Sequence, residues 1–112
     1  MFENQRVLVT GGAGFIGSNL ARQLSEAGAR VRTTLHIRNS NDPIAEAEYV
    51  SADLQALDAC REVVKDMDYV FMCAANTQGA AVMTGTPMAH VTPNVVMNTY
   101  MLEACHQAGV KK

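Results

Sequence analysis

The stretch that decides the fold is Thr10-Gly11-Gly12-Ala13-Gly14-Phe15-Ile16-Gly17-Ser18. It follows Val7-Leu8-Val9, a run that is apolar at consecutive positions and therefore predicts a strand buried on both faces of a parallel sheet. Apolar residues then recur at helical spacing, at Phe15, Ile16, Leu20, Leu24 and Ala27. Gly28 stands where a helix ends in a residue that tolerates positive φ, and a second strand fits Arg30 to Leu35. Strand, glycine turn, helix and strand together form a βαβ unit.

The rest of the chain continues this alternation. We predict strands over 48–52 and 69–74, a helix over 57–64, and a last helix over 94–108. For that last helix, Thr92 is the expected N-cap, Pro93 the first helical residue and Gly109 the stop. Right-handed crossovers then give an α/β fold, an open parallel Rossmann-type sheet in the order 3-2-1-4 with helices on both faces.

Length and composition limit the function classes. A chain of 112 residues predicts a single domain, 1–112, and 48% hydrophobic against 18% charged residues excludes disorder. With a formal charge of −2 and no basic stretch beyond Lys111-Lys112, we expect no nucleic-acid partner. No apolar run is long enough to span a bilayer, so we expect no membrane partner.

Cysteine and histidine usage predicts a cytoplasmic protein without a metal site. Cys60, Cys73 and Cys105 are odd in number and far apart, which favours a reducing compartment over a disulfide framework. The three histidines, His36, His90 and His106, show no metal-ligand spacing.

The glycine turn predicts a dinucleotide site. Gly11 opens the turn, Gly14 lets the backbone approach a pyrophosphate, and Gly17 lets the helix pack closely on the strand. We expect free N–H groups on Gly14, Phe15 and Ile16 to face the phosphates, helped by the helix dipole. A plain strand-to-helix turn without a ligand is the alternative. A P-loop is excluded because no Gly-Lys-Ser/Thr follows.

The end of the second strand bears on the choice of cofactor. A site for NAD usually places an acid there, on the ribose 2′-hydroxyl. Here the sequence is Leu35-His36-Ile37-Arg38, with no acid before Asp42. Because Arg38 could accept a 2′-phosphate, the sequence favours NADP over NAD, while an Arg38 that is simply a solvated loop residue leaves NAD open.

The glycine stretch closely resembles the opening of the extended short-chain dehydrogenase/reductase family, the NAD(P)-dependent epimerases and dehydratases of nucleotide sugars. The resemblance continues to the end of the chain. It implies that Asp53, with Leu54, contacts the adenine after the third strand, and that Ala74 and Ala75 pass under the cofactor ribose. Asn94 resembles a further cofactor-binding position, on the helix that leads to the family's fifth strand.

The same resemblance implies that catalytic residues are missing from these 112 residues. The family's acid/base pair is Tyr-x-x-x-Lys, whereas Tyr49, Tyr69 and Tyr100 are followed four positions later by Asp53, Cys73 and Ala104. We therefore expect an amino-terminal cofactor-binding part that lacks the carboxy-terminal substrate domain and is inactive alone. One possibility is that it is the NAD(P)-binding part of a nucleotide-sugar epimerase, dehydratase or reductase. The alternative is a stand-alone NAD(P)-binding or interaction module without catalytic activity.

A truncated sheet predicts self-association. Strand 69–74 would have an unpaired outer edge, and one face of helix 94–108 would lie bare. We expect a homodimer through one of these two elements, which a monomeric scattering profile at high concentration would contradict.

Overall fold

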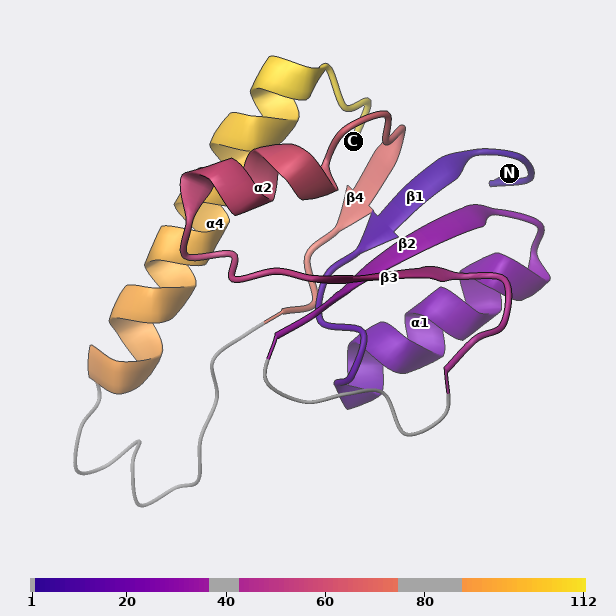
Figure 1. The fold of residues 1–112 in the computed structure, drawn as a ribbon, viewed down its shortest axis with the longest axis horizontal. Coiled ribbons are helices and arrows are strands. Elements are labelled where there is room, and N and C mark those ends of the chain that lie inside the picture. Colours follow the sequence, from indigo (N-terminus) through magenta and orange to yellow (C-terminus); the bar gives the residue numbers. More distant parts are fainter. Residues whose placement is uncertain (1, 37–42, 75–87) are drawn as a thin grey trace.

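A computed structural model describes residues 2–36, 43–74 and 88–112. In these residues the chain forms a four-stranded parallel sheet in the order β3-β2-β1-β4, with helices on both faces (Figure 1). This confirms the predicted sheet order. The strands are β1 (Arg6–Val9), β2 (Arg30–Leu35), β3 (Glu48–Ser51) and β4 (Tyr69–Phe71), and the helices are α1 (Phe15–Glu26), α2 (Leu57–Val63) and α4 (Met88–Ala108).

The central strand β1 is buried on both faces, as its apolar run predicts. Val7 and Val9 belong to the core under α1, while Leu8 belongs to the core under α2 and α4. All three side chains are 0% exposed. Alternate residues of one strand thus join two apolar cores, and this holds α1 on one side of the sheet and α2 with α4 on the other (Figure 1).

Two glycines end the long helices by the same hydrogen-bond pattern. At Gly28, φ is 91°, and the amide of Ala29 donates to the carbonyl of Leu24 at 3.0 Å. At Gly109, φ is 73°, and the amide of Val110 donates to the carbonyl of Cys105 at 3.1 Å. Such six-to-one bonds satisfy carbonyls that a helix end would otherwise leave unpaired, and they reverse the chain direction.

The reversal at Gly109 corrects the prediction of a bare edge on strand 69–74. The chain returns along the outer side of β4, where the amide of Lys111 donates to the carbonyl of Asp68 at 2.9 Å. The amide of Val70 donates in turn to the carbonyl of Lys112 at 2.8 Å. The strand is also shorter than predicted, ending at Phe71, and it is half-buried. Because of these bonds, the outer edge of β4 has fewer free backbone groups with which a second copy of the chain could pair.

The start of the last helix also differs from the prediction. The helix α4 begins at Met88, so Thr92 is not its N-cap and Pro93 lies inside it. A proline inside a helix removes one backbone hydrogen bond and crowds the preceding turn. The helix continues because Met97, Met101 and Ala104, further along, are buried against α2 and the sheet. Tertiary packing therefore outweighs the local capping signal.

No helix in the described ranges combines the length and the apolar character that crossing a membrane would require.

Candidate functional site

The glycine turn lies at the carboxyl ends of the strands, where the order of the sheet changes direction. From β1 the chain moves to β2 and β3 on one side and later returns to β4 on the other side. The turn that joins β1 to α1 therefore lies between the ends of β2 and β4 (Figure 1). In open α/β sheets, ligands bind in the crevice at this point.

Hydrogen bonds to β2 hold one side of the turn. The amide of Gly11 donates to Oγ1 of Thr34 at 3.1 Å. The amide of Gly12 donates to the carbonyl of the same threonine at 2.8 Å. Both the side chain and the backbone of Thr34 are thus used to fix the first half of the turn.

A second threonine holds the end of β4 against the other side. Oγ1 of Thr10 accepts the amides of Cys73 and Ala74, each at 3.0 Å. Thr10 is 0% exposed. As a result the backbone of Ala74 lies so close to Gly11 that a Cβ on this glycine would be 2.9 Å from the Cα of Ala74.

At two of the glycines a side chain would meet backbone atoms. Gly11 has a φ of 79°, and it also faces the close approach of Ala74. Gly17 is buried in the first turn of α1, and a Cβ there would overlap the carbonyl of Gly11. Gly14 differs, because a Cβ would lie 3.4 Å from the Gly11 carbonyl oxygen, close to ordinary contact.

The first amides of α1 form a donor site open to solvent. Within the described residues, no protein acceptor reaches the amides of Phe15 and Ile16. The side chains of these two residues are 85% and 69% exposed, and the N-cap Gly14 offers no side-chain acceptor. Unpaired amides at the positive end of a helix dipole are suited to bind an anion.

One of the three predicted phosphate donors is already used. The amide of Gly14 donates to the carbonyl of Gly11 at 3.1 Å, so the expectation that it is free is wrong. The tight turn itself takes this amide, because it brings the carbonyl of Gly11 back toward the start of the helix. Gly14 can still serve by letting a ligand approach its backbone.

The remaining predicted cofactor-binding residues differ in how accessible they are to a ligand. Asp53 follows β3 at the same end of the sheet and is exposed, with Oδ1 accepting the amide of Gln55 at 3.0 Å. Leu54 is 4% exposed within the core, so its side chain is not available to a ligand. Asn94 lies half-buried on α4 and already interacts with the protein. Arg38 and Ala75 lie outside the described residues.

Sequence reasoning missed Thr10 and Thr34. The sequence feature that could have identified them is a hydroxyl residue immediately before the first glycine and another near the end of the second strand. The pattern does not show which amides they meet, because Thr10 and Ala74 are 64 residues apart in the chain.

The three thiols of the chain are poor nucleophiles. Burial, with smaller contributions from Cys105 and Asp53, raises the pKa of Cys60 to about 11. Burial also raises the pKa of Cys73, which lies beside Thr10, and that of Cys105. All three therefore stay protonated near neutral pH.

Known proteins match almost the whole chain. The model of the NAD dependent epimerase/dehydratase family matches residues 7–112. GDP-mannose 3,5-epimerase 1 of Oryza sativa subsp. indica is 30% identical over 112 residues, which cover 98% of this chain and 30% of the relative. A 3 beta-hydroxysteroid dehydrogenase/Delta 5-->4-isomerase of Mycobacterium tuberculosis (strain CDC 1551 / Oshkosh) is 33% identical over 110 residues, 96% of this chain and 30% of that protein.

A solved structure agrees with these matches. The UDP-glucose 4-epimerase of Thermus thermophilus, in complex with NAD, superposes with a TM-score of 0.82 at 29% identity. The match covers 95% of this chain and 35% of that one. The chain thus spans about a third of the length of each of these three proteins.

The contrast between two glycines gives a first prediction. Gly17→Ala should lower the free energy of unfolding by about 3 kcal/mol or more, because the new methyl meets a backbone carbonyl that cannot move aside cheaply. Gly14→Ala, the matched control, should cost less than about 1 kcal/mol. Urea denaturation measures both, and equal losses in the two variants would contradict the geometry described for Gly17.

The threonines give a second prediction. Oγ1 of Thr33 is buried beside Gly12, and no hydrogen-bond partner reaches it from residues 2–36, 43–74 or 88–112. Thr33→Val should therefore raise the free energy of unfolding by about 1 kcal/mol, whereas Thr10→Val should lower it by about 2 kcal/mol by leaving two amides unpaired. Chemical denaturation measures the free energy of unfolding of both variants. A destabilised Thr33→Val protein would show that this hydroxyl does have a partner.

Proposed function

The chain belongs to the NAD-dependent epimerase/dehydratase family, and on this premise we propose that residues 1–112 hold the dinucleotide of an enzyme that acts on a nucleotide sugar. The single observation that carries the proposal is that the amides of Phe15 and Ile16, at the start of α1, meet no acceptor in the part of the chain that the structure describes. They lie at the switch point of the sheet, beside a turn that glycines keep free of side chains.

These residues fit the pyrophosphate of the cofactor. The amides of Phe15 and Ile16 would donate to its oxygens, and Gly14 would allow the close approach of the backbone. The backbone of Ala74, fixed by Thr10, would border the ribose on the other side of the crevice. When bound, the nicotinamide takes up and returns a hydride. The protein residues named here bind and orient the cofactor.

The adenosine end decides between NAD and NADP. Asp53 is exposed after β3, where its carboxylate would accept from the adenine amine. At the end of β2 the position expected to hold an acid is the half-buried Leu35, whose carbonyl accepts the amide of Ala52 at 2.8 Å. Because Leu35 offers no carboxylate to the ribose hydroxyls, a 2′-phosphate meets no like charge there. We propose that the chain accepts NADP at least as well as NAD.

The substrate class rests on named relatives. The Oryza relative is a GDP-mannose epimerase, and the Thermus structure is a UDP-glucose epimerase, so a nucleotide sugar is the substrate that we propose. The Mycobacterium relative is named a 3 beta-hydroxysteroid dehydrogenase, so a hydroxysteroid is the second candidate substrate class. Since no Tyr-x-x-x-Lys occurs in the 112 residues, we propose that they do not catalyse alone.

The self-association and the location stay predictions. A dimer through α4 fits the structure better than one through β4, because Val91, Val95 and Leu102 are exposed along the helix at 48%, 56% and 71%. The outer side of β4 already pairs with the last residues of the chain. A cytoplasmic location rests on the cysteine pattern.

The cofactor preference is tested at Leu35. Titration calorimetry of the chain with NAD and NADP should show binding of both, with NADP no weaker. Leu35→Asp should strengthen NAD and weaken NADP, moving the ratio of the two dissociation constants by about tenfold or more, since a carboxylate pairs with the 2′-hydroxyl and repels the 2′-phosphate.

Leu35→Asn is the matched control, because it has nearly the same shape without the charge. It should leave the ratio within about threefold of that of the original chain. Failure of the original chain to bind either dinucleotide would overturn the proposed function, and an unchanged ratio in Leu35→Asp would overturn the role of Leu35.

A further inference from the structure

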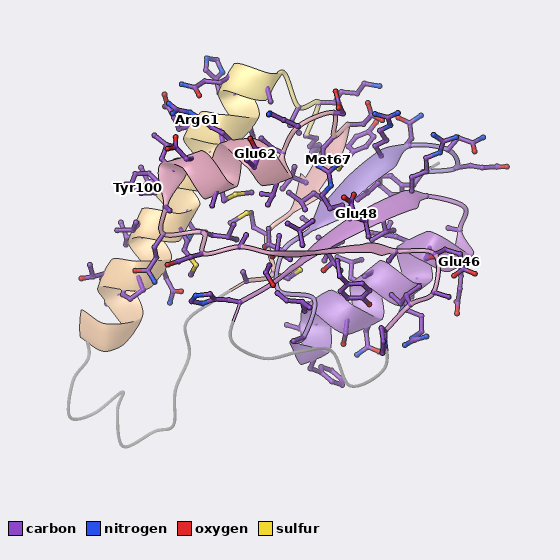
Figure 2. All side chains as sticks on the ribbon, viewed as in Figure 1. Glu46, Glu48, Arg61, Glu62, Met67 and Tyr100 are labelled. Atoms are coloured by element: carbon purple, nitrogen blue, oxygen red, sulfur yellow. The ribbon has the colours of Figure 1, made fainter. Side chains whose placement is uncertain are left out.

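A hollow of about 430 Å³ lies at the opposite end of the sheet from the glycine turn. Its lining includes residues from the amino-terminal ends of β1, β2 and β3 and from the loop before β4: Arg6, Arg30, Arg32, Glu46, Glu48 and Met67. Figure 2 shows Glu46, Glu48 and Met67 around this end, beside the part of the sheet that α2 leaves uncovered. Its volume is within the range of small-molecule sites.

Two arginines stand at paired positions of neighbouring strands and line this hollow. Arg6 of β1 and Arg30 of β2 are partners in the parallel register, so their side chains leave the same face of the sheet. Both are exposed, and neither guanidinium has an acidic partner among the described residues. Like charges placed directly opposite each other destabilise a sheet unless an anion lies between them.

Most other charged groups near the two arginines already have partners within the protein. Arg32 pairs with Glu48 at 2.8 Å and donates from Nη1 to the carbonyls of Val63 and Lys65, each at 2.9 Å. It thereby binds the carboxyl end of α2 and neutralises Glu48. Asp68 accepts the backbone amide of Arg6 at 2.9 Å and faces Lys111 at 3.9 Å. Among the charged groups that line the hollow, the guanidiniums of Arg6 and Arg30 and the exposed carboxylate of Glu46 are therefore the ones available to a ligand.

We propose that this hollow binds a phosphate monoester, with its phosphate between Arg6 and Arg30. Two guanidinium groups supply planar forks of donors that match phosphate oxygens. Glu46 repels a second anion but accepts hydrogen bonds from hydroxyl groups, which favours an ester on a polyhydroxy compound over a dicarboxylate. The site is separate from the glycine turn, so it does not depend on the proposed function.

The test uses the 112-residue chain and two probes at fixed ionic strength, inorganic phosphate and ribose 5-phosphate. Nuclear magnetic resonance follows the side-chain Nε–H signals of the arginines and the backbone amides. We expect shifts at Arg6 and Arg30, and tighter binding of ribose 5-phosphate than of inorganic phosphate. Arg6→Gln and Arg30→Gln should each weaken binding by about tenfold or more, because each removes a charge-assisted pair of hydrogen bonds.

Arg61→Gln is the matched control. Arg61 is an exposed arginine of α2 that contacts Asp58 and Gln107 outside the hollow, so this variant should bind both probes like the original chain. The Arg6 and Arg30 side chains are exposed, so their variants should keep the native amide spectrum. Shifts confined to Phe15 and Ile16, or equal affinities in all three variants, would overturn the proposed site. Equal affinity for the two probes would overturn the ester.

Discussion

The structure depends on the close approach between the first turn of α1 and the carbonyl of Gly11. That approach is possible because Gly17 has no side chain, and it brings the start of the helix down onto the end of β1. One consequence is that the amide of Gly14 is taken by the turn. Another is that the amides of Phe15 and Ile16 have no acceptor among the described residues, at the positive end of the helix.

Two threonines extend this local constraint to the whole sheet. Thr34 binds the turn to β2 and Thr10 binds the end of β4 to the same turn, so three strands converge on the glycines. Both threonines are buried, so the amides beside them would be costly to leave unpaired. The two hydroxyls supply the acceptors that these amides need. The glycine turn is therefore held in place by hydrogen bonds that mainly involve backbone amides.

The sequence predicts the architecture well, because apolar runs and glycine positions carry that information locally. The bounds of β2, the order of the sheet and the helix stops at Gly28 and Gly109 follow from such patterns. The start of α4 does not, since burial of Met97 and Met101 outweighs the capping signal at Thr92. The path of Lys111 along β4 and the hydroxyl contacts of Thr10 join residues far apart in the chain, and no local pattern encodes them.

A crystal structure of the chain grown with NAD tests directly whether the amides of Phe15 and Ile16 bind the pyrophosphate. We expect pyrophosphate oxygens about 2.7–3.2 Å from the amide nitrogens of both Phe15 and Ile16, with the amide of Gly14 still bonded to the carbonyl of Gly11. A dinucleotide whose phosphates lie elsewhere, or a glycine turn that rearranges so that these two amides face the protein, would contradict this expectation.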